Sequence, residues 1–119
     1  MRTQFTIVGS LPGLNDYTRA CRANRFAGAK MKTAAEVLVS WQLPRVKHQG
    51  RVCVSFAWHE RDKRRDPDNI AFAKKFLLDA MVARGVIPND SQRYIAGLSD
   101  TFHVDSGNPR VVVTIEEAS

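Results

Sequence analysis

The sequence predicts a single α/β domain over residues 1–119, in which a small mixed sheet of about four strands is covered by two helices. The chain is long enough for one hydrophobic core and too short to divide into two. Several short stretches alternate with the period of a strand, and two longer stretches repeat apolar residues with the period of a helix. The predicted order is strand, helix, strand, helix, strand, strand.

The first half of the chain is expected to contain a strand, a long helix and a second strand. The first strand is TQFTIVG, which ends at Gly9. Asn15 is expected to cap a helix that continues to about Leu43, with a break allowed at Gly28, and Pro44 stops it. The stripe expected to face inward is Val37, Leu38 and Trp41, and a cationic row about one turn apart is Arg19, Arg22 and Arg25.

The second strand, RVCVSFAWHE, alternates clearly, and its apolar face is expected to be Val52, Val54, Phe56 and Trp58. The other face is also fairly apolar, which favours a central position in the sheet. A second amphipathic helix is expected over residues 69–84, with Gly85 in the usual C-terminal capping position. Two further strands, RYIAGLSDTFHV and RVVVTIEE, are expected to be joined by the turn DSGNP.

Cysteine usage and hydropathy indicate an ordinary cytoplasmic protein. Cys21 and Cys53 lie in apolar stretches without metal-ligand spacing, so both are expected to be reduced core residues. No apolar run approaches the roughly 18 residues that span a bilayer, and the N-terminal apolar run is too short for a signal peptide. No membrane partner is therefore expected.

The charge distribution favours a polyanionic partner. The net charge is +6, and the first 60 residues carry nine Lys/Arg against three Asp/Glu, whereas the remaining 59 carry nine of each. A basic surface attracts DNA or RNA at long range. The alternative is that the excess charge serves solubility alone, and charge by itself does not decide between the two.

Asp66 and Asp68, in the stretch RDKRRDPDNIAFAKK, allow two interpretations. An aspartate before a proline is a normal helix start, and a second acid in the first turn suits the helix dipole. Alternatively, both carboxylates point to one side of an extended segment and hold a divalent ion. A third acid, Asp90, lies in a connector, whereas Asp79 is better explained by a polar helix face. Four cations next to the pair suit an approaching phosphate: Arg61, Lys63, Arg64 and Arg65.

The ordered set RRDPDNI, a lysine-bearing helix with LLDAM, and GVIPNDSQ resembles the RusA-type Holliday junction resolvases, small endonucleases that cut branched DNA. The similarity extends from LPGLN to the last strand. It implies a mixed sheet with two helices, a homodimer, and Mg²⁺ as cofactor, with Mn²⁺ as an alternative. By resemblance, Asp66, Asp68 and Asp90 match the metal-binding aspartates, and Asn69 and Asn89 are expected next to them.

The resemblance also implies a functional lysine on the helix after Asn69, but the spacing here differs. The distance from Asn69 to LDA is about three residues longer than in familiar members, close to one helical turn. If the family's lysine position is located by counting back from Asp79, it falls on Lys75. If it is located by counting forward from Asn69, it falls on Phe72. Lys74 and Lys75 both remain candidates.

The leading interpretation is a magnesium-dependent endonuclease that acts on four-way junctions or other branched DNA. In it, the loop cations and the helix row Arg19, Arg22 and Arg25 hold the DNA backbone. Its rivals are a non-catalytic DNA-binding protein, in which the aspartates only cap a helix, and a protein-interaction module with incidental basicity.

Chain geometry limits where Asp90 can lie. A straight helix over residues 69–84 is about 24 Å long, and the connector with Asp90 begins at its far end. Asp90 must therefore fold back almost directly or come from a partner chain.

Overall fold

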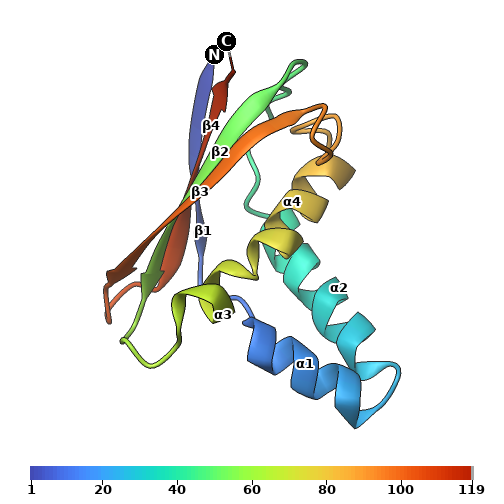
Figure 1. Cartoon of the computed structure of the whole chain (residues 1–119), viewed down its shortest axis with the longest axis vertical. Helices are drawn as coiled ribbons and strands as arrows, with labels where there is room; N and C mark the ends of the chain where they lie inside the picture. The colour runs from blue at the N-terminus through green and yellow to red at the C-terminus, as the bar shows by residue number, and fades with distance from the viewer. Residues whose placement is uncertain (119) are drawn as a thin grey trace.

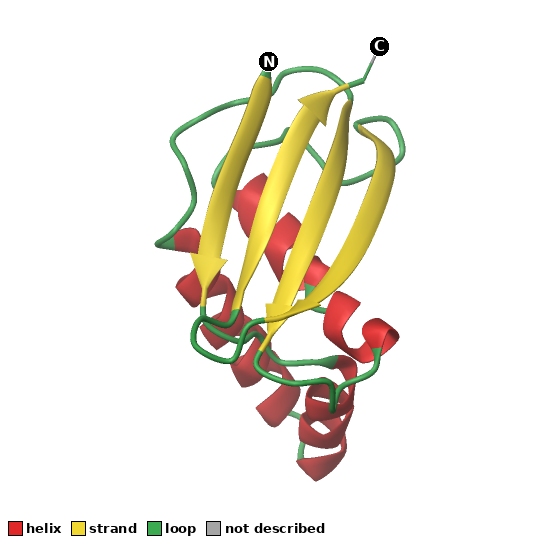
Figure 2. Cartoon of the chain, turned by 90° about the vertical axis from the view of Figure 1, so that its left-hand side faces the viewer, coloured by secondary structure: helices red, strands yellow, loops and turns green. Residues whose placement is uncertain are grey.

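A computed structural model, which describes residues 1–118, contains a four-stranded mixed sheet and four helical segments (Figures 1 and 2). In chain order the elements are β1 (Arg2–Val8), α1 (Leu14–Ala23), α2 (Ala27–Ser40), β2 (Val52–Glu60), α3 (Pro67–Ala71), α4 (Lys74–Ala83), β3 (Ile95–Val104) and β4 (Arg110–Glu117). The strand order is β1-β4-β2-β3. The predicted fold class is confirmed, and β2 has two neighbours, as expected for a central strand.

The connections explain this strand order. β2 and β3 are parallel, so the chain must cross back between them, and α3 and α4 make that crossover. The turn over residues 105–109 then carries the chain past the end of β2, so that β4 lies antiparallel on its other side. β1 completes the sheet against β4. Helices α2 and α4 lie on one face of the sheet, and Figure 2 shows the opposite face without a covering layer.

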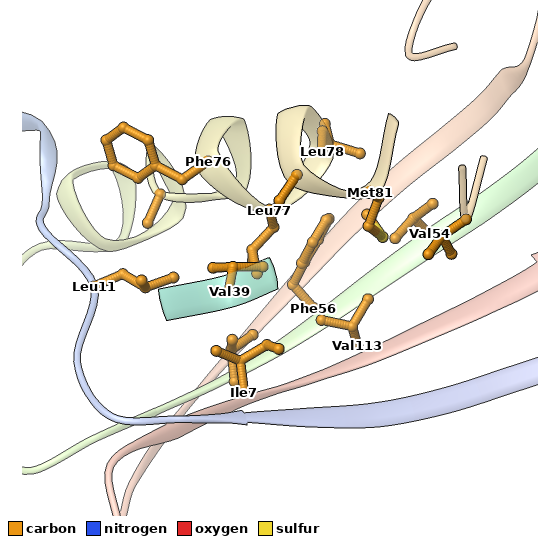
Figure 3. Packing of buried hydrophobic residues seen from close by; sticks show 14 of the residues in the cluster. Ile7, Leu11, Val39, Val54, Phe56, Phe76, Leu77, Leu78, Met81 and Val113 are labelled. Carbon is orange, nitrogen blue, oxygen red and sulfur yellow. The ribbon is translucent and has the colours of Figure 1, made fainter. Parts of the chain in front are cut away.

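The core lies between this sheet and the two helices (Figure 3). The predicted face of β2 is buried, with Val52, Val54, Phe56 and Trp58 each 3% exposed or less. Figure 3 shows Phe76, Leu77 and Met81 of α4 above Phe56, with Val39 of α2 beside them. Burial of alternate strand residues against every third or fourth helix residue is the arrangement that the two periodicities predict.

The predicted first helix is two helices, and the break lies before Gly28 rather than at it. Asn24 separates them because its side-chain oxygen accepts hydrogen bonds from the backbone N–H groups of Phe26 and Ala27, at 3.0 and 2.9 Å. Gly28 is inside α2, where a Cβ would lie only 2.4 Å from the Cys21 sulfur. The glycine therefore permits close packing of α1 on α2.

The predicted inward stripe of this helix is wrong. Val37, Leu38 and Trp41 are 50%, 42% and 83% exposed, whereas the neighbouring Ala35 and Val39 are buried. The helix is rotated relative to the prediction because Ala35 and Val39 pack on the sheet and α4. The stripe Val37, Leu38 and Trp41 consequently lies at the surface.

Both cysteines are free, but neither belongs to the core. Cys53 is exposed because its side of β2 is the uncovered face of the sheet. Cys21 is exposed because α1 buries none of its residues. No helix within residues 1–118 combines the length and apolar character needed to cross a membrane.

The predicted second helix is also divided, with a turn at Phe72 and Ala73 between α3 and α4. Its apolar residues still face the core, since Ile70, Ala73 and Phe76 are buried. Gly85 ends α4 with φ +77°, as the sequence predicts.

Replacing Gly85 with alanine should destabilise the protein by about 1–2 kcal/mol, because an L-residue is strained in the left-handed region. Space is not the reason, since the nearest atom to an added Cβ is the Lys47 Cε at 3.8 Å. Urea unfolding measures the effect. Gly50→Ala is the matched control, because that glycine has open space and no positive φ. Equal stability of the two variants would contradict the argument.

Candidate metal and DNA-binding site

The loop after β2 brings two aspartates to the start of α3. Asp66 occupies the N-cap position with φ −72° and ψ 154°, Pro67 is at the helix start, and Asp68 lies in the first turn. The Asp66 side chain nevertheless makes no capping hydrogen bond. Both aspartates are exposed, and neither forms an ion pair within the described chain. Asp66 therefore occupies the predicted N-cap position without using its carboxylate as a cap, and neither carboxylate is held in an ion pair by residues 1–118.

Asp90 does not join this pair within one chain. It is exposed in the connector after α4, and Figure 1 shows that connector at the opposite end of α4 from α3. No group of three metal-ligating side chains occurs among residues 1–118. Asn89, expected near the metal, instead accepts a hydrogen bond from the Ser91 backbone N–H at 2.9 Å and shapes the connector.

Asn69 joins the start of α3 to the start of α1. Its side-chain oxygen accepts a hydrogen bond from the backbone N–H of Asn15 at 2.8 Å. The predicted role of Asn15 as N-cap is wrong, because Gly13 holds that position. A Cβ at Gly13 would lie 2.4 Å from Arg65 Nη2 and 2.6 Å from Asn69 Oδ1, so glycine allows the close approach.

Arg65 differs from the other cations of its loop. Its guanidinium donates to Glu60 at 3.0 Å and to the Leu11 carbonyl at 3.3 Å, and its side chain is 26% exposed. Arg65 therefore ties the end of β2 to the segment before α1. This structural contact was not predicted from the sequence; Arg61, Lys63 and Arg64, the other predicted DNA-binding cations of the loop, are exposed.

The two candidate lysines have different surroundings. The Lys74 ammonium lies 2.5 Å from Asp100 of β3, and the same carboxylate accepts a hydrogen bond from the Trp58 indole at 2.8 Å. Lys75 is 56% exposed and lies 3.6 Å from Asp79. Asp100 was not predicted as part of the site. In the structure it lies opposite Phe56 in the parallel register of β2 and β3, and this register cannot be read from the sequence.

Asp79 links two helices, in agreement with its predicted role as a polar contact. Its carboxylate lies 3.5 Å from Lys32 of α2 and 3.6 Å from Lys75 of its own helix. These partners account for the residue without a metal ion.

A protein-family model matches the part of the chain that contains these acids and cations. The family model described as Endodeoxyribonuclease RusA matches residues 15–116. The chain belongs to the RusA endodeoxyribonuclease family. The match includes both aspartates of α3 and the connector that carries Asp90, and it confirms the resemblance seen in the sequence. No curated protein matches the chain significantly.

In this RusA-family chain the cationic row predicted on the first helix is only partly helical. Arg19 and Arg22 belong to α1, whereas Arg25 follows its end and lies 4.7 Å above the Phe26 ring. Arg19 and Arg61 line one hollow of about 660 Å³ between α1 and the loop before α3. The fold thus brings the two predicted cationic segments to one surface.

His59 adds no charge to this surface. It is the penultimate residue of β2 and lies on the uncovered face, where its ring stacks on that of His103 at 4.7 Å. Burial, followed by the positive charge of Arg110, lowers the pKa of His59. The ring is therefore neutral at pH 7, and the cationic surface consists of arginines and lysines.

Arg64 and Arg65 should behave differently although they are adjacent. Arg64→Ala should leave the free energy of unfolding unchanged and weaken DNA binding, because its side chain is 90% exposed and meets Asp62 only at 3.8 Å. Arg65→Ala should destabilise the fold by about 1.5–3 kcal/mol, because Glu60 loses its charged partner. Urea unfolding and DNA binding in chelator measure the two effects. Equal stability losses would contradict the assignment.

Proposed function

We propose that this chain is a magnesium-dependent endodeoxyribonuclease that resolves four-way junctions or other branched DNA by paired cuts. The observation that carries the proposal is that two exposed carboxylates lie at the start of α3, next to a cationic loop in a RusA-family chain. Neither carboxylate forms an ion pair within residues 1–118. Carboxylate oxygens are the ligands that Mg²⁺ prefers, and within residues 1–118 these oxygens form neither an ion pair nor a capping hydrogen bond. Their donor chemistry therefore fits the ion.

Each group in the site has a separate physical task. Asp66 and Asp68 hold the ion, which when bound supplies Lewis-acid activation of the phosphodiester and of water. Arg61, Lys63 and Arg64 hold backbone phosphates beside it, with Arg19 across the shared hollow. A lysine stabilises the charge that gathers on the phosphate oxygens. Lys75 is the better candidate because its ammonium is more exposed than that of Lys74, which is paired with Asp100.

The third carboxylate is best supplied by a second copy of the chain. Asp90 and the α3 aspartates lie at opposite ends of α4, so a homodimer can bring them together where one chain does not. The surface beside Asp66 suits such a contact: Phe102 and Val104, which are 40% and 50% exposed, line a hollow of about 370 Å³ with Asp66. Two symmetric sites would then make the two cuts.

Asp68→Asn tests the metal site. Under the proposal it removes a charged ligand, so cleavage of a labelled four-way junction in magnesium should collapse while junction binding in chelator is kept or strengthened. Asp66→Asn and Asp90→Asn should behave in the same way. Glu36→Gln is the control, because this acid belongs to α2 and its ion-pair partner is Lys32, which has no proposed part in the site. Near-parental cutting by the Asp68 variant would favour a DNA-binding protein in which the acids only start a helix.

Mixing variants tests whether Asp90 acts across the dimer. A heterodimer of Asp68→Asn and Asp90→Asn chains has one intact site if Asp90 comes from the partner, and none if it acts in its own chain. The mixture should therefore recover junction nicking after subunit exchange, whereas each variant alone is inactive. A mixture of Asp66→Asn and Asp68→Asn is the matched control and should stay inactive. Absence of recovery, or a strictly monomeric sedimentation profile with and without junction, would refute the shared site.

A further inference from the structure

A second surface, at the end of α4 away from α3, has the chemistry of a nucleic-acid contact. Trp41 follows α2 and is 83% exposed, whereas the other tryptophan, Trp58, is 3% exposed. Tryptophan is usually well buried, so an indole left almost wholly in solvent requires an explanation. Trp41 lines a hollow of about 740 Å³ together with Arg45, Lys47 and Arg84.

The charges around this tryptophan are all positive. The residues that line the hollow include three cations and no acid. All three cations are exposed, and none forms an ion pair within residues 1–118. Arg45 and Lys47 are two residues apart in a non-helical connector, so both can point to the same side. The hollow therefore presents an aromatic surface inside an uncompensated positive field.

The walls of the hollow are anchored. Gln42 accepts a hydrogen bond from the Val8 N–H at 2.7 Å, which fixes the turn after Trp41 to β1. The His48 N–H donates to the Val86 carbonyl at 2.9 Å, which joins the connector to the segment after α4. The buried His48 ring lies 2.9 Å from the Thr3 hydroxyl. Burial lowers the pKa of His48, so the ring is neutral at pH 7 and adds no charge.

We propose that this hollow binds an unpaired nucleotide of the DNA substrate, with its base stacked on Trp41 and its flanking phosphates held by Arg45, Lys47 and Arg84. Base stacking on an exposed aromatic with nearby cations is the usual mode of single-strand binding. The inference rests on the proposed function for its choice of DNA. It deepens that proposal, because a contact that needs an unstacked base favours an open branch over continuous duplex.

The charge pattern disfavours a second copy of the chain as the occupant. Two copies that met through this surface about a two-fold axis would bring six cations together, and like charges across an interface are unfavourable. The hollow also lies at the end of α4 that leads to Asp90, away from the α3 aspartates of its own chain. In the proposed dimer it would consequently lie on the side of the partner's aspartates.

Tryptophan fluorescence provides a direct readout in chelator, without any dependence on cleavage. A short oligothymidine should quench the emission of Trp41, while the buried Trp58 should not respond. Trp41→Phe should retain the affinity for labelled oligothymidine, because the ring still stacks. Trp41→Leu should lower it by about 5- to 150-fold, the range expected from loss of one stacked base. Val37→Ala is the control for a small loss of exposed apolar surface on α2 and should bind like the parent.

Cationic variants and a duplex complete the test. Arg45→Ala and Arg84→Ala should each weaken oligothymidine binding and reduce its salt dependence. A fully paired, blunt-ended duplex should quench Trp41 less than oligothymidine does. Equal quenching by the duplex, or parental affinity of Trp41→Leu, would overturn the proposal. A fall in sedimenting mass of Trp41→Leu would overturn it too, since the surface would then join two copies. The parent's junction cleavage in magnesium tests the proposed function separately.

Discussion

The site depends on the packing of the segment before α1 against the loop before α3. Arg65 holds this contact from one side through Glu60 and the Leu11 carbonyl, and Asn69 holds it from the other through the Asn15 backbone. Gly13 lets the two side chains come close. With this contact in place, the α3 aspartates, the cationic loop and the arginines of α1 occupy one side of the molecule. α1 has no fully buried residue, and its other support is the packing of Cys21 on Gly28 of α2 and of Tyr17 on Phe72 and Phe76.

The ion pair of Arg65 with Glu60 also explains why Asp66 and Asp68 are not neutralised by the arginine that precedes them. Arg65 pairs with Glu60, which leaves Asp66 and Asp68 without a cationic partner. Lys74 pairs with Asp100, and Asp79 contacts Lys32 and Lys75. The acids and cations that support the fold thus pair with one another, whereas Asp66 and Asp68 form no ion pair within residues 1–118.

The sequence predicted features that depend on local pattern and missed features that depend on tertiary packing. The buried face of β2, the element order and the helix start at Asp66 follow from residues close in the chain. The exposure of Trp41 could not be predicted, because it depends on how α2 is rotated against α4 and the sheet. The pair of Lys74 and Asp100 was missed for a similar reason: it requires knowing that β3 lies beside β2, below α4. The position of Asp90 likewise depends on the direction of α4.

The one-sided coverage of the sheet has a consequence for the thiols. Cys53 belongs to β2, on its uncovered face, and Cys21 belongs to α1, which Figure 1 shows at the end of the molecule away from the chain termini. Both thiols are free and exposed in the folded chain, and a disulfide between them would require their Cα atoms to be within about 7 Å. Oxidation would cross-link separate molecules through their surfaces. A reducing environment therefore prevents such cross-links, and each thiol offers an independent position for a spectroscopic label.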